Sequence, residues 1–255
     1  MNLLDTHSHI YLEDFDLDRK LMIQRAEEEG VIKIIMPAID STTHQRMLDT
    51  TNEFTGICMA MMGLHPCSVN ENYREELKIT ENYLQKVKFQ AIGETGLDYH
   101  WDLTFKKEQL EVFRQQISWA LHYDIPVVIH SRNSIDDCIK IISENQKGKL
   151  KGVFHCFSGT TEQASQIIDL GFYLGIGGVI TFKNSGLDKV MQEVNLESVV
   201  LETDAPYLSP VPFRGKRNEC SYLKYILKKL ADIKQFSEEE IATVTTGNAV
   251  ELFNI

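Results

Sequence analysis

Short apolar runs recur along the whole chain, and a stretch with helical periodicity follows each of them. Eight runs have the composition of buried strands, at residues 3–4, 32–36, 57–62, 89–92, 126–129, 152–154, 172–176 and 199–201. Most are continuously hydrophobic, which is typical of strands in a parallel sheet covered by helices. Helical spacing of apolar residues is found near residues 18–29, 43–52, 74–87, 104–122, 134–145, 161–169, 186–194, 220–231 and 237–253.

Eight alternating strand and helix units in 255 residues predict an α/β fold of the TIM type, a closed (β/α)₈ barrel. Such barrels commonly use about 250 residues as one domain. We therefore expect residues 1–255 to form a single domain. A doubly wound open sheet is the alternative, but that architecture rarely needs eight evenly spaced parallel strands.

The composition is that of a globular protein in a reducing compartment. Hydrophobic residues make up 43% of the chain and charged residues 25%, which are ordinary values. The five cysteines are scattered and form no C-x-x-C motif, which argues against a disulfide framework and a cysteine-rich zinc module. No signal peptide is recognisable, and no apolar stretch approaches the ~18 residues that span a membrane. We expect a cytoplasmic protein without membrane contact, and no obligate protein partner is indicated.

Six residues that can bind a divalent cation lie at the ends of the apolar runs, namely His7, His9, Glu94, His130, His155 and Asp204. The carboxyl ends of parallel barrel strands share one rim, so we expect these side chains to meet there. Burying so many polar groups without a metal would be costly. Imidazole and carboxylate ligands suit Zn²⁺, Mn²⁺ or Fe²⁺ and, more weakly, Mg²⁺. The sequence therefore predicts a metal centre at the C-terminal ends of the strands.

We expect two divalent ions, one held by His7, His9 and Asp204 and the other by His130 and His155, with Glu94 as a bridge. Two such ions, about 3.5–4 Å apart, would activate a water and clamp a displacement at phosphorus.

Further residues near this centre have predicted roles in the reaction. Glu94 and Asp204 would position and deprotonate the water, and Arg132 would stabilise charge on the phosphoryl oxygens. Glu202 shares a strand face with Asp204 and would hold a ligand histidine or a third ion.

Substrate contacts are predicted at the same rim, for His65, Tyr99, Arg132, Arg214, Lys216 and Arg217. The last three form the densest basic cluster in a chain of net charge −11. Charge runs are usually solvated surface, but this location favours an anchor for backbone phosphates. Trp101, Tyr207 and Phe213 are rim aromatics that would stack on an unpaired base, although packing under loops is the favoured role for at least two of them.

Seven motifs resemble those of the TatD family of metal-dependent hydrolases, in the amidohydrolase superfamily. In chain order they are D-T-H-S-H, G-L-H-P, G-E-T-G-L-D-Y-H, I-H-S-R, H-C-F-S-G, E-T-D-A-P-Y-L and R-G-K-R-N-E, from Asp5 to Glu219. The resemblance implies deoxyribonuclease activity, commonly 3′→5′ exonucleolytic, on DNA ends that we expect to be single-stranded, with Mg²⁺, Mn²⁺ or Zn²⁺ as cofactor. Cys220 departs from the pattern, because the family usually has proline there.

Other functions remain open at this point. Some TatD relatives act as D-aminoacyl-tRNA deacylases, and the same ligand set suits that ester hydrolysis. A small-molecule amidohydrolase or lactonase is less favoured, because such barrels often bridge their metals with a carboxylated lysine. A binding protein that has lost catalysis is disfavoured by the presence of all six ligands.

Overall fold

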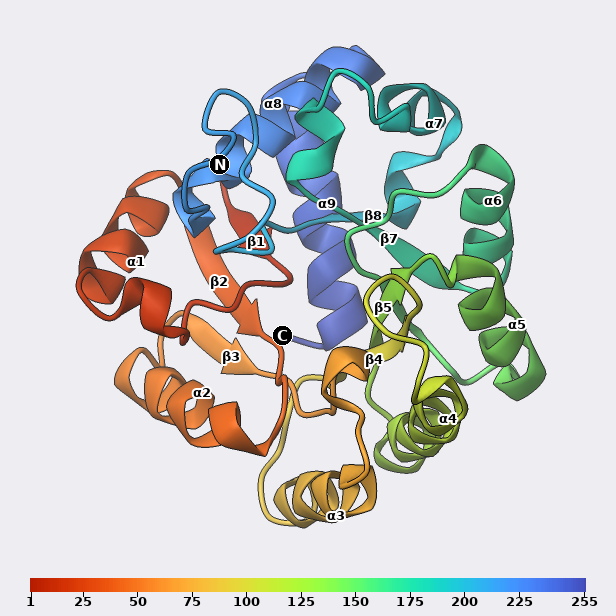
Figure 1. Ribbon diagram of the computed structural model, residues 1–255. Coiled ribbons are helices and arrows are strands. Elements are labelled where there is room, and N and C mark those ends of the chain that lie inside the picture. The colour runs from red at the N-terminus through yellow and green to blue at the C-terminus, as the bar shows by residue number, and fades with distance from the viewer.

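Eight parallel strands form an inner ring, α1 to α8 pack outside it, and α9 lies across one end of it (Figure 1). The computed structural model describes all of residues 1–255. The strands are β1 (Leu3–Asp5), β2 (Val31–Met36), β3 (Cys58–Ala60), β4 (Ile92–Asp98), β5 (Val127–Arg132), β6 (Gly152–Phe154), β7 (Phe172–Ile176) and β8 (Val199–Leu201). The helices are α1 (Arg19–Glu28), α2 (Ser41–Glu53), α3 (Tyr73–Leu84), α4 (Lys106–Tyr123), α5 (Ile135–Asn145), α6 (Thr161–Asp169), α7 (Leu187–Glu193), α8 (Leu223–Lys234) and α9 (Glu238–Phe253). The predicted (β/α)₈ architecture is confirmed.

Two joints close the ring. Continuous pairing gives the orders β1-β2-β3 and β4-β5-β6-β7-β8. Met62, just beyond β3, pairs in parallel with Ile92 of β4 as an isolated bridge. At the other joint, the Thr6 amide after β1 donates to the Leu201 carbonyl of β8 at 3.1 Å. All eight strands therefore deliver their C-terminal ends to one rim.

The barrel interior is apolar toward one end and polar toward the other. A cluster of ten buried residues fills the apolar end with side chains from the strand segments and from α9, namely Leu4, Ile35, Met61, Ala91, Val128, Val153, Val200, Ala249, Leu252 and Phe253. Helix α9 runs across the centre of the ring in Figure 1 and contacts β1 and β8. Val128, Val153 and Val200 each precede a polar interior residue by two positions, so the same strand faces carry both regions.

Strands β4 and β5 extend further than hydrophobicity predicted. The apolar run at 89–92 suggested a strand ending before Glu94, whereas β4 continues to Asp98 and pairs with β5 up to Arg132. Leu97 is the one large apolar side chain among the added residues, so the hydrophobic signal ends before the strand does. Gly96, at φ +132°, permits the close pairing, since a Cβ there would collide with the His130 carbonyl. Asp98 is therefore the last residue of a strand.

Local capping explains several helix starts. Ser237 and Glu240 form the capping box that starts α9, where the sequence S-E-E-E predicted it. Helix α8 begins at Leu223, later than expected, because Cys220–Tyr222 form a 3₁₀ turn first. Cys220 itself is buried there, with its Sγ 3.3 Å from Ser8 Oγ. None of the helices combines the length and the hydropathy needed to cross a lipid bilayer.

Candidate metal centre

Two imidazoles approach one oxygen of Glu94, and Asp204 lies beside them. Glu94 Oε2 lies 3.1 Å from His7 Nε2 and 3.5 Å from His9 Nε2, and the two imidazole nitrogens are 3.3 Å apart. Asp204 Oδ1 lies 3.8 Å and 3.7 Å from the same nitrogens. Ligand atoms bound tetrahedrally to a divalent ion at about 2.1 Å are about 3.4 Å from one another. The ligand atoms of His7, His9 and Glu94 lie within 4.8 Å of one another, as do those of His7, His155 and Asp204. This spacing fits a cation beside His7, with Asp204 on the side of the two imidazoles.

The other oxygen of Glu94 faces a second group of imidazoles. Glu94 Oε1 lies 2.9 Å from His130 Nδ1 and 3.4 Å from His155 Nε2. His65 Nε2 is also 3.4 Å away. The ligand atoms of His65, Glu94 and His130 lie within 4.8 Å of one another. Glu94, only 2% exposed, thus stands between two potential cation sites with one oxygen in each.

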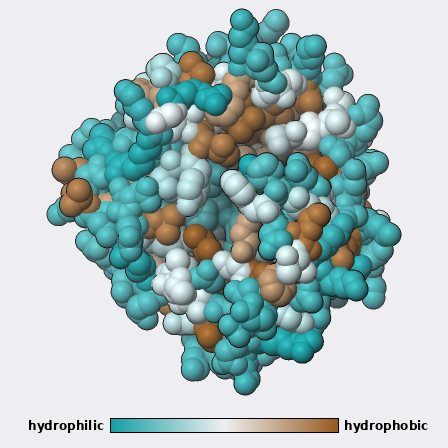
Figure 2. Space-filling model, viewed as in Figure 1, coloured by the Kyte–Doolittle hydropathy of each residue, from teal (hydrophilic) through white to brown (hydrophobic).

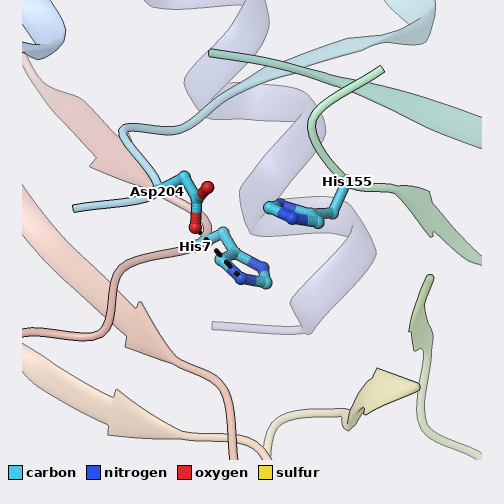
Figure 3. A group of neighbouring side chains, drawn as sticks. All are labelled: His7, His155 and Asp204. Atoms are coloured by element: carbon cyan, nitrogen blue, oxygen red, sulfur yellow. Dashed lines mark ion pairs between the residues drawn. The ribbon is translucent and has the colours of Figure 1, made fainter. Parts of the chain in front are cut away.

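The chain delivers the first group from opposite sides of the β1–β8 joint. His7 and His9 lie just beyond β1, and the Asp204 amide donates to the His7 carbonyl at 2.9 Å. Asp204 has a φ of 57°, a left-handed conformation that turns the chain after β8. Figure 3 shows the His7 ring stacked on that of His155, with Asp204 directed toward His7; the two ring centroids are 3.6 Å apart.

The hydrogen bonds of His9 leave its Nε2 free for a cation. Tyr11 has one hydroxyl proton, which it donates to the Pro37 carbonyl at 2.7 Å. Its oxygen must therefore accept from His9 Nδ1–H, which is 3.1 Å away. Neutral His9 then presents the Nε2 lone pair to the Glu94 carboxylate, an arrangement that calls for a cation between them.

Carboxylates also hold the two histidines of the second group. Asp98 Oδ2 accepts from His130 Nε2 at 2.9 Å, and Glu202 Oε1 lies 3.0 Å from His155 Nδ1. Glu202 is fully buried, and its Oε2 has no hydrogen-bond partner. Gly175 makes room for it, since a Cβ there would lie 2.5 Å from that oxygen. Carboxylate–histidine pairs of this kind fix the ring orientation of metal ligands.

Burial and mutual charge move the pKa values of the centre in different directions. Burial lowers the pKa of His7 to about 4 and raises the pKa of Asp204 to about 6. Burial opposes protonation of His155, but the carboxylates of Glu202 and Glu94 outweigh it and raise its pKa to about 10. These two carboxylates therefore favour a proton on the His155 ring, and a metal ion would compete with that proton.

The predicted substrate residues divide into two groups. His65 lies against Glu94, as described, and Arg132 is exposed at the end of β5. Tyr99, by contrast, donates its hydroxyl to Asp137 of α5 at 2.9 Å, and Lys106 lies over its ring at 3.9 Å. The hydroxyl is thus bound to α5, which argues against a hydrogen bond from Tyr99 to the substrate, the contact predicted for it.

The basic cluster after β8 is also divided. Arg214 and Lys216 are exposed, and the Arg214 guanidinium lies over the Phe182 ring at 3.8 Å. Arg217 instead makes two bonds to the Asp18 carboxylate, at 2.7 and 2.8 Å. It also donates to the Asp14 carbonyl at 2.6 Å. Its donors hold the loop against the start of α1, which argues against the predicted phosphate contact of Arg217.

Three positioning residues are absent from the predicted site, namely Tyr11, Asp98 and Asn218. Tyr11 has the same two-residue spacing from His9 that His9 has from His7, so this signal was present in the sequence. Asp98 lies in the G-E-T-G-L-D-Y-H motif, and recognition of β4 as a longer strand would have placed it at the rim. Asn218 donates from Nδ2 to two carbonyls, on either side of Asp204, and nothing in its spacing indicates this.

Comparison with known proteins agrees with this geometry. The family model described as TatD related DNase matches residues 4–254. The uncharacterized metal-dependent hydrolase YabD of Bacillus subtilis is 41% identical, over 99% of each chain. The 3′-5′ ssDNA/RNA exonuclease TatD of Erwinia tasmaniensis is 28% identical, over 99% of this chain and all of its own. The crystal structure of the Escherichia coli TatD homologue YjjV superposes with a TM-score of 0.91 at 31% identity, over 99% of this chain and 98% of its own. The protein therefore belongs to the TatD family of metal-dependent hydrolases.

Proposed function

We propose that the protein is a deoxyribonuclease that removes nucleotides from the 3′ ends of single-stranded DNA with the help of two divalent metal ions. The observation that carries this proposal is the position of Glu94. Each of its oxygens lies within 3.5 Å of at least two imidazole nitrogens, in two separate groups. A carboxylate shared in this way is the bridge that a two-metal hydrolase requires. The printed activity of the Erwinia tasmaniensis relative supports the choice of nucleic acid.

The chain's own groups suit hydrolysis at phosphorus. Two ions bound at Glu94 would acidify a water and neutralise charge on the phosphodiester. Asp204 Oδ1, less than 4 Å from His7 and His9 Nε2, would accept the proton of that water. Glu94, with one oxygen in each group of imidazoles, would fix the two cation sites relative to each other. His65, whose Nε2 approaches the second group, would contact the substrate phosphate from the rim.

Unpaired cations at the rim support a polyanionic substrate. Arg132 forms none of the chain's ion pairs, whose acidic partners belong to other residues. Arg214 and Lys216 are likewise exposed and without a carboxylate partner. In a chain of net charge −11, such groups concentrate attraction for phosphate at one place. We propose that Arg132 binds the scissile phosphate and that Arg214 and Lys216 bind the strand farther away.

The test is stepwise shortening of a 5′-labelled single strand by protein loaded with Mg²⁺ or Mn²⁺. The matched variants are Glu94→Gln, which keeps the shape but removes the charge, and Glu251→Gln, an exposed change on α9. We expect wild type and Glu251→Gln to shorten the strand from its 3′ end, and Glu94→Gln to be at least 10³-fold slower.

The same preparations are assayed on duplex DNA and on D-aminoacyl-tRNA. Equal release by wild type and Glu94→Gln would overturn the proposal. Deacylation without strand shortening would overturn it in favour of the tRNA substrate.

A further inference from the structure

Trp101 is exposed to a degree that packing does not explain. It lies in the loop between β4 and α4, and 70% of its surface is accessible. Trp119, the other tryptophan of the chain, is buried in α4 with 6% accessible. A large apolar ring left in water forgoes the stabilisation of burial. Hydrophilic side chains cover most of the face seen in Figure 2, and apolar ones gather in patches nearer its centre.

One carboxylate connects this tryptophan to the metal centre. Asp98 Oδ1 accepts from the backbone amides of His100 at 2.8 Å and Trp101 at 3.4 Å. The second oxygen of Asp98 accepts from His130 Nε2 at 2.9 Å. The start of the loop is therefore fixed relative to a candidate metal ligand.

Arg132 lies over the indole from the end of β5. It follows His130 by two residues on β5, and its guanidinium carbon lies 5.0 Å from the centroid of the Trp101 ring. A guanidinium that lies over an aromatic ring keeps its N–H groups available at the edge. No carboxylate neutralises Arg132. One face of the indole thus carries a cation that has no carboxylate partner, and the other face is left for a ligand.

A small pocket borders the same ring. Pro66, Val69 and Phe105 form its apolar walls, and Trp101 closes one side. The pocket also includes Asp98, so it adjoins the metal centre. The other lining residues are Cys67, Asp102 and Gln109, and the volume of about 70 Å³ is too small to enclose a base. A flat heteroaromatic ring would therefore stack on the exposed indole and not enter the pocket.

We propose that Trp101 and Arg132 form a subsite for one unpaired nucleotide next to the scissile phosphodiester. The base stacks on the indole, and Arg132 binds the phosphate beside that base. This inference rests on the proposed nuclease function and deepens it, because it explains a preference for single strands. The bases of a duplex end are paired and stacked on their neighbours, and they offer no free face to the indole until the end opens.

Binding is tested by tryptophan fluorescence, which does not depend on cleavage. Protein loaded with Mg²⁺ is titrated with a single-stranded oligonucleotide that carries phosphorothioate linkages at its 3′ end. We expect saturable quenching in wild type and its loss in Trp101→Phe, which retains only the buried Trp119. Quenching of equal size in the two proteins, or no quenching in wild type, would overturn the subsite.

Kinetics on two substrates separate stacking from a general structural effect. One strand ends in ordinary nucleotides, and the other has abasic sites at its last two positions. We expect Trp101→Ala to raise KM for the ordinary strand about tenfold and for the abasic strand less than about twofold. Leu103→Ala is the matched control, because Leu103 is 57% exposed on the same loop.

An equal rise on both strands, or no rise on either, would contradict the inference. If wild type releases no nucleotide from any strand, the proposed nuclease function fails. The fluorescence titration then still decides whether Trp101 binds a base.

Discussion

The carboxylate of Asp98 accepts a hydrogen bond from His130 Nε2 at 2.9 Å, and this contact points the other ring nitrogen at Glu94. A neutral His130 that donates to Asp98 has its lone pair on Nδ1, where a cation would bind. The candidate metal ligand His130 on β5 is therefore oriented by Asp98 on β4. The contact makes the second half of the metal centre dependent on a residue that binds no metal in our proposal.

Asp98→Asn is expected to weaken metal binding about 10- to 100-fold at the second group. Its Oδ1 already accepts from two backbone amides, so the amide –NH₂ of asparagine would have to face a donor on one side. Metal content and competition with a chelating dye measure the loss. Asp102→Asn, an exposed change in the same loop, is the control and should bind metal as wild type does. Unchanged affinity in Asp98→Asn would show that His130 needs no such support.

Asn218 is expected to control the geometry of Asp204. Its Nδ2 donates at 2.7 Å to the carbonyls of Thr203 and Tyr207, which flank Asp204 and its left-handed turn. Asn218→Asp replaces these donors with buried oxygens facing carbonyls. We expect a stability loss of about 1–3 kcal/mol and a fall in kcat of at least about tenfold. Steady-state kinetics and urea denaturation measure the two effects.

Asn184→Asp serves as the control for Asn218→Asp, because it makes the same chemical change at an exposed position. It should leave both quantities unchanged. If Asn218→Asp loses stability but retains wild-type kcat, the two hydrogen bonds of Asn218 stabilise the fold and do not position Asp204.

The fold could be predicted from the sequence because hydrophobic burial sets it. Buried parallel strands must be apolar, and every predicted run contains or adjoins an observed strand. The same logic failed where β4 continues beyond Ile92, since strand residues at a polar barrel mouth lose the hydrophobic signal. Convergence of the metal-binding residues was also predictable, because parallel strands end at one rim.

The partners of the site residues were not predictable, because they come from distant parts of the chain. Arg217 was read from local charge as a phosphate anchor, but Asp18, 199 positions away, takes up its guanidinium. Tyr99 was predicted to contact the substrate, but its hydroxyl donates to Asp137 on α5. Sequence spacing reports which residues share a strand face. It does not report which side chains of other elements face them.

Metal affinity is expected to rise with pH. The carboxylates of Glu202 and Glu94 outweigh burial and raise the pKa of His155 to about 10, so at neutral pH a metal ion must displace its proton. Affinity should therefore increase about tenfold per pH unit from pH 7 to pH 9. Burial raises the pKa of Asp204 to about 6. Below that pH a proton on Asp204 also competes with the metal ion, so metal affinity should fall more steeply as the pH decreases.

Competition with a chelating dye between pH 5 and pH 9 measures this dependence. Calorimetry in two buffers of different ionisation enthalpy counts the protons released. Affinity that stays flat across the range would mean that His155 is already neutral in the metal-free protein.

Alanine is expected to change the stability of the protein in opposite directions at Gly247 and at Gly30. Gly247 lies exposed within α9, and a Cβ there would meet no atom within 4 Å. Gly247→Ala lowers the entropy of the unfolded chain and should stabilise the protein by about 0.5–1 kcal/mol. Gly30 has a φ of +88°, and a Cβ there would collide with the Met1 carbonyl, so Gly30→Ala should destabilise. Urea denaturation in excess chelator isolates these effects from metal binding. A destabilised Gly247→Ala would mean that α9, which closes the apolar end of the barrel, is not regular helix at this position.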